Sequence, residues 1–302
     1  MSSNSTTESP VKKRFALAML SLVVLISIGS CMIGINAFYE QERTPVRKFT
    51  LIQGNPSGLL QIDATVTAVD PVRDTMKVRL EFHPKGDLLE KNGHDIARDV
   101  HVLTTNTSGP AEFILKKHHE PHPVELTLNL YDGEVSNYPI DEYKADLQIE
   151  TFLEAGSEDE TPVPMIINFT AKNHVLEVQA EMAPGGEAHE LDLLLRLKRP
   201  NVVKGFAWFV NGLMVMMALC AVIVAFNVAY RGKKLEPNLL VWMSALLFVL
   251  PSLRATLPGA PPIGALTDFL VFFWVEGAIA LCLFIMVLTW YGRVPDNAAE
   301  KG

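Results

Sequence analysis

The stretch Leu239–Trp290, LLVWMSALLFVLPSLRATLPGAPPIGALTDFLVFFWVEGAIALCLFIMVLTW, consists of two apolar blocks on either side of a segment rich in proline and glycine. Each block is long enough for an α-helix to cross the roughly 30 Å hydrocarbon core of a bilayer. We therefore expect two membrane-spanning helices, at residues 239–257 and 266–291, joined by a short elbow. The helix-breaking residues of the elbow are Pro258, Gly259, Pro261, Pro262 and Gly264.

Three ionisable side chains lie in or beside these two helices, where a charge is costly and marks a functional position by default. Arg254 lies near the end of one helix and Asp268 at the start of the next, so the elbow is expected to bring them together as an ion pair. Glu276 lies about 10 residues into its helix, near mid-membrane at roughly 1.5 Å per residue. Asn211 or a partner subunit is a candidate to pair with it. A structural pairing and a role in ion, proton or lipid binding both remain open for Glu276.

Two further apolar segments, at 15–38 and 206–230, complete a predicted set of four membrane helices. The first is longer than the apolar core of a signal peptide. Residues Ile28–Cys31 form a loose lipobox, so a lipoprotein or a cleaved signal is the alternative to a retained helix. The second segment repeats small or hydrogen-bonding residues every seven positions, which favours close helix packing in membranes: Asn211, Ala218 and Ala225.

Strict alternation of apolar and polar residues characterises the region between 40 and 200. A period of two indicates strands with one buried face, and Asn, Asp, Gly and Pro turns separate the alternating runs. This pattern predicts an all-β domain, a β-sandwich of about 8–10 strands. The clearest runs are Leu60–Ala68, Val78–Phe82, Val124–Leu130, Ala145–Ile149 and Leu191–Leu197.

The charge distribution predicts how the chain crosses the membrane. The region 40–200 has a net charge of −12 and the remainder +4, which together make the −8 of the whole chain. Basic clusters flank the apolar segments at Lys12–Arg14, at Arg231–Lys234 and at Arg293. Basic flanks face the cytoplasm, so we expect both termini inside and the β-domain outside the plasma membrane. An acidic domain also argues against a nucleic-acid partner.

The expected organisation is therefore an all-β extracytoplasmic domain with one membrane helix before it and three after it. The predicted segments are a disordered cytoplasmic tail at 1–14, a helix at 15–38, the β-sandwich at 40–200, helices at 206–230, 239–257 and 266–291, and a cytoplasmic tail at 292–302.

The run Asn137–Tyr143, NYPIDEY, leads directly into one of the alternating strands. Pro139 fixes its own φ and restricts Tyr138, while Asp141 can accept bonds from nearby backbone amides. We expect a rigid corner in which Tyr138 or Tyr143 lays its ring on the sandwich and directs its hydroxyl to a backbone group. A contact with a ligand or partner is the alternative. Because the elbow is predicted on the same side of the membrane as the β-domain, it is expected to touch the sandwich near this corner.

All eight histidines lie in the β-domain, and three are close together at His118, His119 and His122. Imidazoles bind Zn, Cu or Ni, which makes this tract a weak metal candidate. Pro121 and the loop setting provide no defined ligand geometry, so a solvated loop is the favoured interpretation.

No nucleophile elbow, phosphate loop, zinc-protease helix or dinucleotide fingerprint is present in the sequence. We therefore expect no enzymatic activity and no cofactor. The leading expectation is a non-enzymatic membrane protein of the cell envelope, acting as a scaffold or accessory subunit for other membrane proteins or copies of itself. The alternatives are a transporter or channel-like protein using Glu276, and a sensor that binds a ligand or metal through the β-domain.

Several motifs resemble an uncharacterised membrane-protein family, domain of unknown function 4436. They are Phe206–Gly212 (FAWFVNG), Leu247–Pro251 (LFVLP), Pro258–Gly264 (PGAPPIG) followed by Asp268 and Phe272–Trp274 (FFW), and Tyr138–Asp141 (YPID). The resemblance covers most of the chain and implies an architecture but no activity.

The Tyr-Pro-x-Asp corner is also similar to a sequence at the base of the β-sandwich in pentameric ligand-gated channels. Two features depart from that pattern: the corner lacks flanking cysteines, and one helix precedes the β-domain with three after it, instead of four after it. This likeness concerns the fold alone.

Overall fold

The computed structural model describes residue 21 and residues 47–51, 57–153, 161–171, 175–182 and 190–293. The chain divides into two compact units, 1–44 and 45–302, and the fold described below belongs to the second. The helix expected at 15–38, the lipobox alternative and both tails lie outside the described residues, apart from Ser21 and the two residues 292–293.

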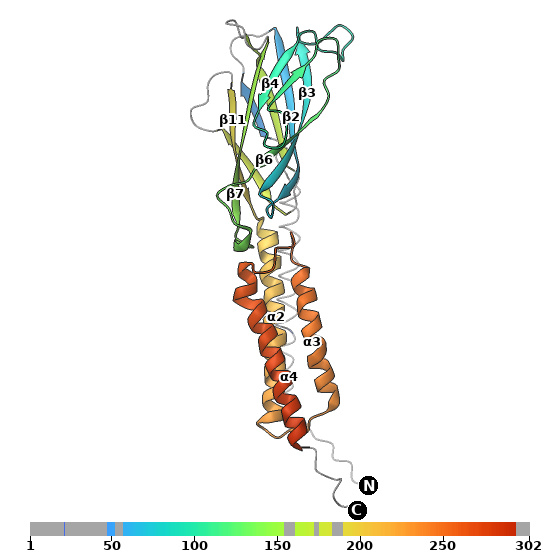
Figure 1. Ribbon diagram of the computed structural model, residues 1–302, viewed down its shortest axis with the longest axis vertical. Coiled ribbons are helices and arrows are strands. Elements are labelled where there is room, and N and C mark those ends of the chain that lie inside the picture. The colour runs from blue at the N-terminus through green and yellow to red at the C-terminus, as the bar shows by residue number, and fades with distance from the viewer. Residues whose placement is uncertain are drawn as a thin grey trace, which may run out of the picture. The chain divides into compact units, whose positions relative to one another are not determined.

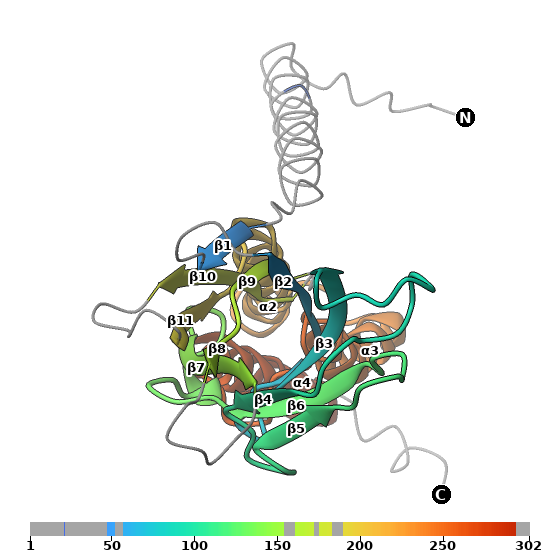
Figure 2. The same cartoon turned by 90° about the horizontal axis from the view of Figure 1, so that it is seen from above.

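The β-domain consists of two sheets, as the alternating pattern predicts (Figure 1). The first sheet has the strand order β1 (Arg47–Leu51), β9 (Met165–Ala171), β2 (Gly58–Asp70), β3 (Thr75–Gly86) and β6 (Val124–Asn129). The second has the order β10 (Glu177–Met182), β11 (Glu190–Lys198), β7 (Glu142–Leu153), β4 (Val100–Thr104) and β5 (Glu112–Leu115), with β8 (Thr161–Pro162) beside β7. Neighbouring strands are antiparallel except for β2 and β9, which run parallel. Figure 2 shows the strands from above, in front of the helices.

The described residues contain eleven strands, slightly more than the 8–10 expected. The additional ones are short: β8 has two residues and β5 has four, too few for a period of two to be recognised. In the long strands the alternating apolar residues are buried between the sheets, as in β7, where Ala145, Leu147 and Ile149 are fully buried. The core of the sandwich therefore follows from the alternation in the sequence.

Three helices follow the sandwich, and each is long and apolar enough to cross a membrane. They are α2 (Asn201–Ala229), α3 (Pro237–Ala255) and α4 (Phe273–Arg293), the last preceded by a short π-helix, η2 (Asp268–Phe272). α2 begins five residues earlier than its apolar run, because Pro200 ends the extended chain and the more polar residues 201–205 continue the helix. α3 likewise begins at Pro237, a favoured residue for the first helical turn.

The helices pack through one hydrophobic cluster that is separate from the core of the sandwich. α2 contributes a buried stripe containing Ala207, Ala218, Ala221 and Ala225, small residues that allow close approach. α4 contributes the stripe Val275, Ile279, Cys282 and Met286. Asn211, Ala218 and Ala225, the residues of the seven-residue repeat, all lie on the buried face of α2.

Leu147→Ala is expected to reduce the free energy of unfolding by about 2–5 kcal/mol, because it opens a cavity at a fully buried position between the sheets. The measurement is urea denaturation of the purified chain in detergent, followed by far-ultraviolet circular dichroism. Ile114→Ala on β5 is the control, since Ile114 is 48% exposed and its loss should cost less than about 0.5 kcal/mol. Equal effects of the two changes would contradict the assigned core.

Candidate functional site

The corner at residues 137–143 connects the two hydrophobic cores of the molecule. It follows a short 3₁₀ helix, η1 (Val135–Asn137), and contains a cis peptide bond between Tyr138 and Pro139. Tyr138 is fully buried in the hydrophobic cluster of the helices, whereas Tyr143, at the start of β7, is buried in the core of the sandwich. Two aromatic rings five residues apart thus belong to different cores.

Of the expected placement of the two tyrosines, the ring position holds for Tyr143, and the hydroxyl partner is corrected. The Tyr143 ring does lie in the sandwich, but its hydroxyl donates a 2.9 Å hydrogen bond to the Asp141 carboxylate, not to a backbone group. The Tyr138 ring packs against the helices, and its hydroxyl has no hydrogen-bond partner among the described residues. The carboxylate of Asp141 attracts the Tyr143 hydroxyl because a charged acceptor makes the stronger bond.

Asp141 also forms an ion pair with Arg199, the first of the two residues between β11 and α2. Arg199 Nε donates to Oδ1 at 3.0 Å and Nη2 donates to Oδ2 at 2.8 Å, with both side chains at most 1% exposed. The Arg199 guanidinium carbon lies 5.0 Å from the centre of the Tyr138 ring, within the range of a cation–π contact. Buried charges persist when they are paired and hydrogen-bonded. Here Arg199 Nε and Nη2 are bonded, whereas Nη1 is buried without a partner among the described residues.

The elbow between α3 and α4 contacts this ion pair through Gly259. Gly259 has φ of +78°, and a Cβ atom there would lie 2.6 Å from Arg199 Nη1 and 2.8 Å from Val175 Cγ1. Only glycine combines a positive φ with such a close approach. The contact expected between the elbow and the base of the sandwich is therefore present, and it includes Arg199, which the sequence pattern did not single out.

A second ion pair closes the elbow, and it is the pair expected from the sequence. Arg254 Nε donates to Asp268 Oδ1 at 3.0 Å, and Arg254 Nη2 donates to Asp268 Oδ2 and to the Pro262 carbonyl, both at 2.8 Å. Asp268 Oδ2 also accepts a bond from the Gly264 backbone amide at 2.8 Å. The elbow is thus held at its two ends and at its centre by polar contacts.

Glu276 and Asn211 do not form a hydrogen bond with one another. Asn211 Nδ2 donates to the Ala207 carbonyl at 2.8 Å, one turn earlier in α2, while Asn211 Oδ1 is buried without a partner among the described residues. Glu276 Oε2 is also buried without such a partner. The structure therefore leaves the pairing of Glu276 unassigned.

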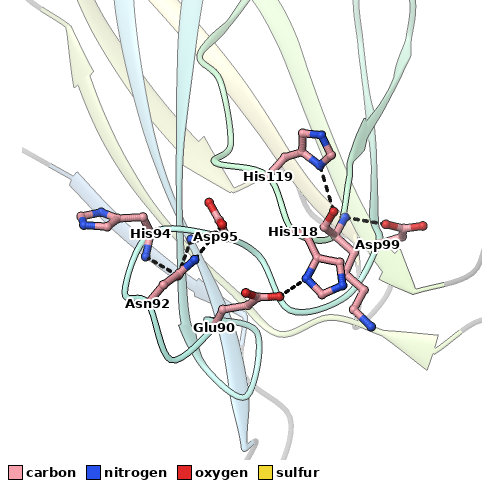
Figure 3. A network of polar contacts seen from close by, with 8 residues as sticks. Glu90, Asn92, His94, Asp95, Asp99, His118 and His119 are labelled. Atoms are coloured by element: carbon pink, nitrogen blue, oxygen red, sulfur yellow. Dashed lines mark hydrogen bonds and ion pairs between the residues drawn. The ribbon is translucent and has the colours of Figure 1, made fainter.

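The histidine tract lies in the loop between β5 and β6, and Figure 3 shows His118 and His119 there. His118 Nδ1 contacts the Glu90 carboxylate, and the His119 ring is bonded to the Lys117 carbonyl at 2.9 Å. The two imidazoles thus have separate partners, and Figure 3 shows them on different sides of the loop. Within the described ranges, no three His, Cys, Asp or Glu residues are arranged to hold a metal ion.

The electrostatics of the corner keep its two tyrosines neutral. Burial raises the pKa of Tyr138 to about 12, an effect that the nearby Arg199 charge partly opposes. The pKa of Tyr143 is raised as well, by burial first and then by the Asp141 charge. Asp141 and Arg199 are paired with one another, and the two tyrosines beside them are neutral at ordinary pH. The arrangement is suited to holding the sandwich against the elbow.

Tyr143→Phe is expected to lower the free energy of unfolding by about 1–3 kcal/mol, because it removes a donor from the buried Asp141 carboxylate. Tyr138→Phe should cost less than about 1 kcal/mol, because the hydroxyl that it removes has no partner among the described residues. Chemical denaturation of the two variants in detergent provides the comparison. A larger loss in Tyr138→Phe would contradict the assigned contacts.

Alkaline pH should destabilise the native chain through the same residues. A tyrosine whose pKa is raised on folding makes its full contribution to the free energy of unfolding below the ordinary pKa of 10.0. That contribution is lost as pH rises through the folded-state pKa of about 12. Tyr138→Phe should therefore make the denaturation midpoint less sensitive to pH over this window. A slope equal to that of the unmodified chain would contradict the burial of Tyr138.

Two different family models match the two parts of the chain, and the boundary between the matches lies where the sandwich meets α2. Residues 51–195 match the model of a domain of unknown function, DUF4436, and residues 199–293 match a second domain of unknown function, DUF8686. No curated protein matches the chain. The motifs at 206–274 from which most of the resemblance to DUF4436 was inferred lie within the DUF8686 match, so the expected coverage is corrected to the sandwich, which includes Tyr138–Asp141. The β-sandwich therefore matches the DUF4436 family model, the family that the sequence motifs resemble.

Proposed function

We propose that this protein is a non-enzymatic integral membrane protein of the cell envelope that presents its β-sandwich to a larger membrane assembly as a scaffold or accessory subunit. The observation that carries the proposal is the buried contact among Asp141, Arg199 and Gly259, which joins the sandwich to the elbow. Only Arg199 and Pro200 separate the end of β11 from the start of α2. A domain held in this way keeps a defined position above the helices.

Charge supports the proposed orientation in the plasma membrane. The loop between α2 and α3 contains Arg231, Lys233 and Lys234, and it lies at the end of the helices opposite the sandwich (Figure 1). Basic loops face the cytoplasm, so the sandwich and the elbow would lie outside the cytosol. With a fourth helix at 15–38, both termini would lie inside.

Lipid and partner contacts would occupy the outer faces of the helices. Large apolar side chains are exposed there, among them Phe248 on α3 and Trp274 on α4. Between membrane helices, association depends on packing and on a few polar contacts because lipid itself is apolar. Other membrane proteins or further copies of this chain are the partners proposed for these faces.

A sensor is the second candidate, and the same junction favours it. A ligand that moved the corner at Tyr138 would act directly on Arg199 and Gly259, without an intervening flexible linker. A scaffold requires a stable partner, whereas a sensor of this kind requires a ligand for the sandwich. Purification of the chain with its native partners therefore separates the two.

Affinity purification of the full chain from native membranes in mild detergent is expected to recover at least one stable partner or a homo-oligomer. Gly259→Ala should reduce that recovery several-fold, because the added Cβ forces Arg199 and Val175 away from the elbow. Gly264→Ala is the matched control: Gly264 also has a positive φ, of +95°, but no atom lies within 4 Å of the added Cβ. Quantitative mass spectrometry of the eluates is the measurement. A clean monomer, or equal losses in the two variants, would contradict the scaffold proposal.

A further inference from the structure

Apart from the Tyr138 hydroxyl, which the sandwich inserts into the helical cluster, three side-chain oxygens in and beside the helices are buried without a hydrogen-bond partner among the described residues. They are Asn211 Oδ1 on α2, Thr267 Oγ1 just before η2, and Glu276 Oε2 on α4. Buried polar atoms in native proteins nearly always have a partner, and an exception calls for a specific explanation such as a bound ion. In lipid the need is greater, because no bulk water is available to satisfy such atoms.

Asn211 is held in a single orientation by its own helix. Its Nδ2 donates to the Ala207 carbonyl at 2.8 Å, and its side chain is 2% exposed. The amide therefore presents Oδ1, an acceptor, to the interior of the helical cluster. Asn227 makes the equivalent bond to the Ile223 carbonyl on the same helix, but its Oδ1 accepts from Arg231 Nη1 at 3.3 Å. Asn211 differs in that its acceptor is left without a donor in the described part of the chain.

Glu276 has no counter-charge among the charged groups of the packed elements. α2 contributes Lys204, which lies seven residues, roughly 10 Å, nearer the sandwich than Asn211. α3 contributes Arg254 and η2 contributes Asp268, and these two neutralise one another. Tyr138, the titratable group that the sandwich inserts among the helices, lies near Arg199, Asp141 and Arg254. Glu276 is partly buried, with its Oε2 atom enclosed, and an ionised and unpaired carboxylate at this depth in the membrane would be strongly disfavoured.

Asn211 and Glu276 lie at a similar depth in the bundle. α2 and η2 both begin at the end that contacts the sandwich, as the approach of Gly259 to Arg199 requires. Asn211 is 10 residues beyond Asn201 and Glu276 is 8 residues beyond Asp268, or roughly 15 Å and 12 Å at 1.5 Å per residue. Both helices contribute to the same buried cluster.

We propose that Glu276 and Asn211 together bind a small monovalent cation, a proton or Na⁺, between α2 and α4. Two acceptor oxygens cannot satisfy one another, but one positive particle between them satisfies both. A proton on Glu276 turns the carboxyl group into a donor to Asn211 Oδ1, and Na⁺ would accept a lone pair from each oxygen. No covalent bond other than O–H forms or breaks. The site goes beyond the scaffold function and does not depend on it.

Infrared difference spectroscopy of the full chain in liposomes tests this site. The spectrum of Glu276→Gln is subtracted from that of the unchanged chain, first in a choline medium between about pH 5 and about pH 9, then with Na⁺ replacing choline. We expect a neutral carboxylic C=O band from Glu276 if a proton is bound. We expect a carboxylate band that shifts between choline and Na⁺ if Na⁺ is bound. Either result supports the site and identifies its cation.

A carboxylate band that responds to neither pH nor Na⁺ would overturn the proposal. Asn211→Leu should shift the Glu276 band, because it removes the acceptor, while Asn227→Leu on the same helix should leave the band unchanged. Identical bands in both asparagine variants would remove Asn211 from the site.

If Glu276→Gln is not recovered from membranes, mapping of carbodiimide modification on the unchanged chain replaces the subtraction. This reagent modifies neutral buried carboxyl groups, so modification at Glu276 that declines with pH or Na⁺ supports the site, and its absence opposes it.

Discussion

The ion pair between Asp141 and Arg199 is the interaction on which the junction of the sandwich and the helices depends. Burying two charges is costly, and the cost is offset only when geometry and hydrogen bonding are both good. Here the guanidinium makes two short bonds to the carboxylate, the Tyr143 hydroxyl supplies a third donor, and the Tyr138 ring covers the guanidinium. Loss of either partner would leave an isolated charge between two hydrophobic cores, so the pair makes each core depend on the other.

The same pair gives the junction its specificity. The charged groups meet only if the corner before β7, the end of β11 and the elbow are all in place, since each contributes one part of the contact. Asp141 lies in the segment that matches DUF4436, whereas Arg199 and Gly259 lie in the segment that matches DUF8686. The ion pair therefore connects two regions that the family comparisons recognise separately.

The elbow is stabilised from two directions. Arg254 and Asp268 close it from the helical side, with further bonds to the Pro262 carbonyl and the Gly264 amide. Arg199 and Val175 contact it from the side of the sandwich at Gly259. A displacement of the sandwich would be transmitted to the start of α4, because the segment between is short and contains several prolines. The elbow is therefore fixed both to the helices and to the sandwich.

The sequence by itself determined the features that depend on local pattern. Alternation marked the strands of the sandwich because burial of one face requires a period of two, and length and composition marked α2, α3 and α4 as helices able to cross a membrane. The Arg254–Asp268 ion pair could also be predicted from the sequence, because a short elbow brings the ends of the two helices, and the charges on them, close together.

Only the tertiary structure decided which residues meet across the junction. Asp141 and Arg199 are 58 residues apart, and their contact depends on the register of β7 against β11, which no local pattern specifies. The tertiary structure also decides that Tyr138 packs among the helices and Tyr143 in the sandwich. The local sequence does not predict which of the two cores each ring joins. The unpartnered oxygens of Asn211 and Glu276 became evident in the same way, because a side chain's partners are known only when all its neighbours are placed.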